Sequence, residues 1–104
     1  MKFLDCIENS DGATVIVHVF DSRLEACNEM DEILIELAEK FVFTKFIKVM
    51  PRDIGSDFDL DVLPSLLVYS NGELLNSLIR VDMRFPRGKF NYEGIEEILL
   101  QYLS

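Results

Sequence analysis

The sequence lacks several features on which whole classes of function depend. Among its 104 residues it has two cysteines, one histidine and no tryptophan, and its apolar stretches are all far shorter than a membrane span. Because a metal centre needs a cluster of ligands, the lone His18 predicts none. The chain also has no glycine-rich phosphate loop and no nucleophile elbow. We therefore expect no cofactor.

Basic residues are also scarce, and this limits the choice of partners. The chain has 10 basic and 19 acidic residues, which gives a net charge of −9. Such a charge repels phosphate backbones and anionic headgroups, so neither nucleic acid nor membrane is expected as a partner. Two cysteines without a secretory signal indicate a reducing compartment, and we expect a cytoplasmic protein. The length predicts one domain over residues 1–104, and a monomer is favoured.

The hydrophobic pattern predicts alternating helices and strands. Residues 13–20 are mostly β-branched or aromatic and do not alternate with polar residues, which is typical of a strand buried on both faces. Residues 24–41 repeat apolar side chains every three or four positions, which is typical of an amphipathic helix. We further expect a helix over 2–9, strands over 44–49, 65–69 and 73–81, a short helical turn within 51–60, a loop over 82–90 and a last helix capped by Asn91. Asn71-Gly72 predicts a tight hairpin between the last two strands.

This order indicates an α/β fold with a mixed sheet of four to five strands flanked by helices. The segment Val62-Leu63-Pro64-Ser65-Leu66-Leu67-Val68-Tyr69 resembles the thioredoxin signature, and by that resemblance the bond before Pro64 is cis. Further blocks, among them Thr14-Val15-Ile16-Val17-His18-Val19-Phe20 and Lys45-Phe46-Ile47-Lys48, lie in the order found in phosducins. The chain therefore resembles the thioredoxin-like C-terminal domain of phosducin and phosducin-like proteins.

The resemblance implies a regulator or folding co-chaperone rather than an enzyme. Phosducins bind the βγ dimer of heterotrimeric G proteins. Phosducin-like proteins work with the cytosolic chaperonin on βγ assembly or on cytoskeletal clients. Either partner is an expectation carried by the family, because nothing in the composition or spacing names one.

The redox position of thioredoxins is degenerate here. By the same resemblance, Leu24 stands where the attacking cysteine would be, and Cys27 stands at the resolving position. The acidic residue of the preceding strand is replaced by His18, and the flanking tryptophans are missing. Glu25 and Glu29 would also disfavour a thiolate electrostatically. We expect no catalytic residue, although a monothiol oxidoreductase that uses Cys27 remains the alternative.

The sole histidine and the two cysteines have simpler interpretations. A core histidine bonded to a neighbour is the expected state of His18. Cys27 and Cys6 are both expected to pack as small apolar side chains.

One short segment concentrates positive charge and aromatic side chains. Its candidate partner-binding residues are Arg80, Arg84, Phe85, Arg87 and Lys89, with Met83 and Phe90 between them. Arginine and aromatic side chains anchor many protein interfaces, and loops often carry function. The alternative is a solubilising loop with one or two aromatic side chains tucked into the core.

Overall fold

The fold was analysed on a computed structural model, which describes residues 12–54 and 60–103. The helix predicted over 2–9, with Cys6, lies outside these residues. The strands are β1 (Thr14–Val19), β2 (Lys45–Val49), β3 (Ser65–Ser70) and β4 (Glu73–Leu78). The helices are α2 (Glu25–Lys40), α3 (Pro51–Ile54) and α4 (Tyr92–Leu99), and the shorter 3-10 turns are η1 (Leu60–Val62), η2 (Val81–Arg84) and η3 (Pro86–Gly88).

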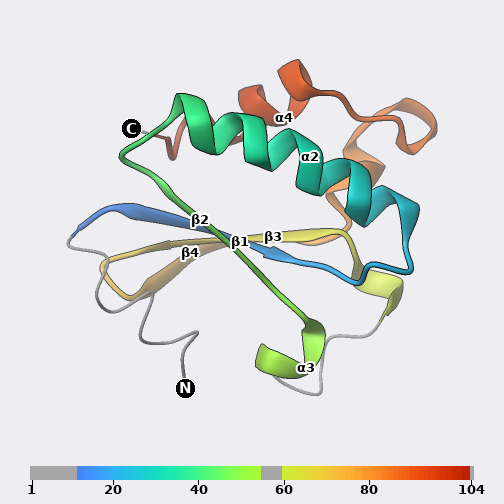
Figure 1. Ribbon diagram of the computed structural model, residues 1–104, viewed down its shortest axis with the longest axis horizontal. Helices are drawn as coiled ribbons and strands as arrows, with labels where there is room; N and C mark the ends of the chain where they lie inside the picture. Colours follow the sequence, from blue (N-terminus) through green and yellow to red (C-terminus); the bar gives the residue numbers. More distant parts are fainter. Residues whose placement is uncertain (1–11, 55–59, 104) are drawn as a thin grey trace.

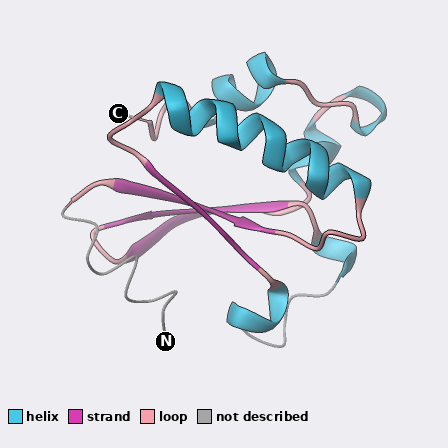
Figure 2. Cartoon of the chain, in the orientation of Figure 1, coloured by secondary structure: helices cyan, strands magenta, loops and turns pink. Residues whose placement is uncertain are grey.

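The described strands form one mixed sheet in the order β2-β1-β3-β4. β1 runs parallel to β2 and antiparallel to β3, and β4 is antiparallel to β3. Figure 1 shows α2 and α4 together on one face of this sheet and α3 on the other. Figure 2 shows the same layers by secondary structure, with the strands crossing between the helices. The predicted four- to five-stranded mixed sheet flanked by helices is therefore confirmed.

Burial explains why β1 and α2 form where the sequence predicts them. Residues 15–19 are all buried, because β1 has a strand on each side and helices on both faces. In α2 the buried residues Cys27, Met30, Leu34 and Leu37 recur every three or four positions, which turns one face of the helix towards the sheet. Ile16, Leu66 and Ile95 join that face in a core beneath α2 and α4.

The predicted hairpin and helix cap are both present. Asn71 and Gly72 have φ values of 53° and 80°, which is the left-handed pair that a type I′ turn needs. The Asn91 side chain accepts a hydrogen bond of 2.8 Å from the Gly94 backbone N–H at the start of α4. None of the helices in the described ranges has the length and apolar composition needed to cross a membrane.

The sequence predictions differ from the structure in two places near residue 80. The last strand ends at Leu78 rather than at 81, because Arg80 adopts a left-handed backbone with φ 48°. The predicted loop over 82–90 contains η2 and η3. Such turns are held by local hydrogen bonds between residues three apart, and they are too short to show a hydrophobic period in the sequence.

Candidate functional site

The two residues that the resemblance to thioredoxins assigns to the redox position lie at the start of α2. Leu24 is the N-cap residue, with an extended backbone and no side-chain capping hydrogen bond. Cys27 follows in the first turn and is fully buried. It packs in a cluster with Val19 and Leu63, and Leu24 lies against the same cluster. Leu24 therefore offers no nucleophilic atom at this end of the helix, and the Cys27 thiol is closed off from solvent.

The surroundings of Cys27 hold its thiol in the neutral form. Burial raises the pKa of Cys27, and the carboxylates of Asp21 and Asp82 raise it further, while a backbone hydrogen bond from Asp21 opposes them. The carboxylates that act on the thiol thus come from either side of α2 along the chain. The sequence had instead predicted that Glu25 and Glu29 disfavour the thiolate. Since the thiolate is the reacting species, this site disfavours thiol exchange.

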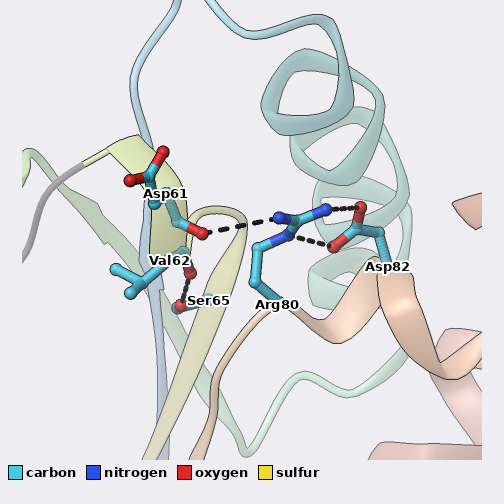
Figure 3. Close-up of polar contacts among 5 residues, drawn as sticks. All are labelled: Asp61, Val62, Ser65, Arg80 and Asp82. Carbon is cyan, nitrogen blue, oxygen red and sulfur yellow. Dashed lines mark hydrogen bonds and ion pairs between the residues drawn. The ribbon is translucent and has the colours of Figure 1, made fainter.

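The loop before β3 lies beside this position and carries Pro64. The Leu63–Pro64 peptide bond is cis, as the resemblance to thioredoxins predicts. Figure 3 shows the Ser65 hydroxyl donating to the Val62 carbonyl. The backbone N–H of Val81 donates to the Pro64 carbonyl at 3.1 Å. The Val62 bond holds the proline loop itself, and the Val81 bond fastens the chain that follows β4 to this loop.

Arg80 is held in place by contacts within the fold. Its guanidinium donates to both carboxylate oxygens of Asp82, at 2.9 and 3.0 Å, and to the Asp61 carbonyl at 3.4 Å (Figure 3). Asp82 is itself buried. A two-pronged ion pair with a buried carboxylate fixes the geometry of η2. The structure therefore gives Arg80 a structural role that its place in a basic run does not suggest.

Phe85 is likewise turned inwards. Its ring is half-buried, packs against the core beneath α4 and lies 6.2 Å from the ring of Phe90. A methyl group added at Gly94 would come within 2.3 Å of the Phe85 ring, so α4 and this side chain are in close contact. Phe85 and Phe90 are thus partly buried and pack against the core, as the alternative for this segment expects of one or two aromatic side chains.

The remaining basic side chains point to solvent. Arg84, Arg87 and Lys89 are exposed, and no ion pair joins any of them to another residue of the described ranges. Met83 beside them is 68% exposed. We call Met83, Arg84, Arg87 and Lys89 the basic surface. In Figure 1 it belongs to the orange segment, on the same side of the molecule as the first turn of α2.

Comparison with known proteins decides the family. The phosducin family profile matches residues 1–102. Over 104 residues, which are 97% of this chain, the sequence is 34% identical to bovine (Bos taurus) phosducin and 33% identical to human (Homo sapiens) phosducin. The chain belongs to the phosducin family. It spans 42% of the length of each of these two relatives.

Solved structures place the phosducin-family domain in the thioredoxin fold. The oxidised thioredoxin of Plasmodium falciparum superposes with a TM-score of 0.73 at 20% identity, covering 99% of this chain and 91% of its own. A thioredoxin variant from Halobacterium salinarum gives a TM-score of 0.72 at 16% identity, covering 100% of this chain and 86% of its own. At these identities the likeness shows the fold alone.

His18 departs from expectation in this phosducin-family domain. It is buried as predicted, yet neither ring nitrogen has a hydrogen-bond partner among the described residues. Burial lowers the pKa of His18 to about 4; Asp31 opposes this shift and Lys48 adds to it. The expected bond to a neighbour is therefore wrong. In the described part of the chain no three His, Cys, Asp or Glu side chains come together as metal ligands would.

Proposed function

We propose that this phosducin-family domain is a non-catalytic protein-binding domain of a cytoplasmic regulator. Its partner is the G-protein βγ dimer, which it contacts through the basic surface. The observation that carries the proposal is a group of exposed cations, Arg84, Arg87 and Lys89, that form no ion pair with any described residue, on a chain of net charge −9. Family membership supports the choice of partner.

Backbone geometry supports a role for Arg87 in binding a partner rather than in stabilising the fold. Arg87 has φ 57°, a left-handed conformation that costs a residue with a side chain about 1 kcal/mol and costs glycine nothing. Its side chain is exposed and makes no ion pair within the described residues. A strained backbone under an exposed arginine that makes no described ion pair favours a role in recognition.

The alternative of a monothiol oxidoreductase has little support. Such an enzyme needs an accessible cysteine of lowered pKa. Cys27 is fully buried, and its pKa is raised. We therefore propose that Cys27 is a packing residue and that no residue of the redox position is catalytic.

Charge reversal on the basic surface tests the proposal. We expect Arg84→Glu and Arg87→Glu each to slow association of the 104-residue domain with purified βγ dimer by about 5-fold at low salt, because charges at an interface mainly set the association rate. The effect should shrink as ionic strength rises. Surface plasmon resonance measures both rates, and thermal unfolding should stay nearly unchanged.

Arg52→Glu is the matched control, because it makes the same change in net charge on α3, across the sheet (Figure 1). Equal association rates for all three variants would contradict the role of the basic surface. If the wild-type domain bound cytosolic chaperonin but not βγ, the partner would be the chaperonin, which the family also suggests, and the choice of βγ would be wrong. Binding to neither would refute the proposal.

A further inference from the structure

A pocket of about 270 Å³ opens between α2 and β2, away from the basic surface. One face of α2 forms its upper wall, since Asp31, Leu34, Ile35 and Ala38 are spaced three, four and seven residues from the first. Such a spacing places all four side chains on a single side of a helix. The wall is aliphatic apart from its first residue.

The sheet forms the other wall and supplies the polar centre of the pocket. Phe46 and Lys48 reach it from alternate positions of β2, and His18 reaches it from β1. His18 is only 1% exposed, and both of its ring nitrogens lack a hydrogen-bond partner within the described residues. The nearest carboxylate oxygen, on Asp31, is 3.9 Å from Nδ1, which is too far for a hydrogen bond. Buried polar atoms of this kind normally have a partner.

The two charged side chains that line the pocket, Lys48 and Asp31, already form an ion pair with each other. The Lys48 ammonium donates to the Asp31 carboxylate at 3.1 Å and lies 5.1 Å from the centre of the Phe20 ring. A charged ligand would have to displace this pair, so the pocket favours a neutral one. A neutral imidazole offers one donor and one acceptor, and a hydroxyl group can serve either.

We propose that this pocket binds a small, neutral aromatic molecule that carries one hydroxyl group, hydrogen-bonded to His18. The aliphatic side chains of α2 and the ring of Phe46 enclose the aromatic part, and aromatic pairs gain from edge or offset contact. A dry cavity of about 150 Å³ is known to hold benzene. The larger volume here suits two fused rings.

Binding of 2-naphthol and naphthalene to the 104-residue chain tests the proposal. The two probes differ by the hydroxyl group alone. Because the chain has no tryptophan and only one histidine, tryptophan emission does not mask the probe fluorescence, and the imidazole NMR signals belong to His18 alone. We expect 2-naphthol to bind at least about 10-fold more tightly than naphthalene and to shift the ring signals of His18 saturably, since a site with unpaired polar groups rejects the analogue that lacks the hydroxyl.

Two variants separate the hydrogen bond from the cavity. His18→Leu should bring the affinity for 2-naphthol down to that for naphthalene. Ala38→Phe should fill the pocket and abolish binding of both probes, whereas Ala26→Phe, outside the pocket on the same helix, should leave binding intact. Circular dichroism checks that each variant is folded. Equal affinity of the two probes for the wild-type chain, or binding to Ala38→Phe as tight as to the wild type, would overturn the proposal.

Discussion

His18 should make the stability of this domain depend on pH in a defined window. The folded protein lowers the pKa of His18 from 6.5 to about 4, chiefly because the ring is buried. Between these values the unfolded chain binds a proton that the folded chain does not, so the free energy of unfolding falls as the pH falls. The contribution is complete above pH 6.5, is lost progressively from there to pH 4, and stays constant below.

The size of the effect follows from the two pKa values. They differ by about 2.5 units, and one unit is worth about 1.4 kcal/mol. We therefore expect the histidine to cost the fold about 3 kcal/mol at pH 4 relative to pH 7, and about 1.4 kcal/mol at pH 5.5. These are large fractions of the 5–15 kcal/mol by which domains are usually stable.

The assay is urea unfolding of the wild type and of His18→Leu at half-unit steps from pH 7.5 to pH 4. The 19 acidic residues titrate in both proteins, so the difference between the two curves isolates the histidine. We expect that difference to grow by about 3 kcal/mol as the pH falls. Parallel curves, or an NMR titration of the single imidazole with a pKa above 6, would refute the reasoning.

Three further predictions concern the core and the helix ends. Cys27, buried and with a raised pKa, should react with a thiol reagent at neutral pH far more slowly in the native state than in urea; fast native labelling would revive the monothiol alternative. Gly94→Ala should destabilise the domain by about 1–3 kcal/mol in chemical unfolding, because the added methyl meets the Phe85 ring; a neutral result would mean that Phe85 moves aside freely. Asn91→Ala should cost about 1 kcal/mol of unfolding free energy by losing the cap of α4, and Asn91→Ser should recover most of it; equal loss in both variants would show that the cap is not the cause.

The elements that the sequence predicted well are those whose residues repeat one simple pattern. β1 is an unbroken run of residues suited to a central strand, and α2 carries apolar side chains on one face over four turns. Asn71-Gly72 and Asn91 are local signals that act on neighbouring backbone atoms. In each case the physical cause lies within a few residues of its effect, so it can be read along the chain.

The candidate site depends on contacts between residues far apart in the sequence or on different elements, and the sequence alone does not predict these contacts. Arg80 and Arg84 look alike in the sequence, yet only Arg80 reaches the buried carboxylate of Asp82. Phe85 can pack against α4 because position 94 is a glycine, which leaves room for its ring. The unpaired state of His18 depends on how far α2 stands from β1 at Asp31. None of these distances can be derived from residue order alone.

The uneven burial of the sheet implies a gradient of hydrogen exchange across it. Backbone amides of β1, with a strand on each side, should exchange only when the whole domain opens, whereas β4 is an outer strand whose first five residues are exposed, so it should open locally. The basic surface begins at Met83, shortly after β4 ends at Leu78. The residues just before it are nevertheless fastened to the chain around Pro64, because the Val81 N–H donates to the Pro64 carbonyl and the Arg80 guanidinium donates to the Asp61 carbonyl. Local opening of β4 should therefore leave the basic surface in place, with the same arrangement of charges in either state.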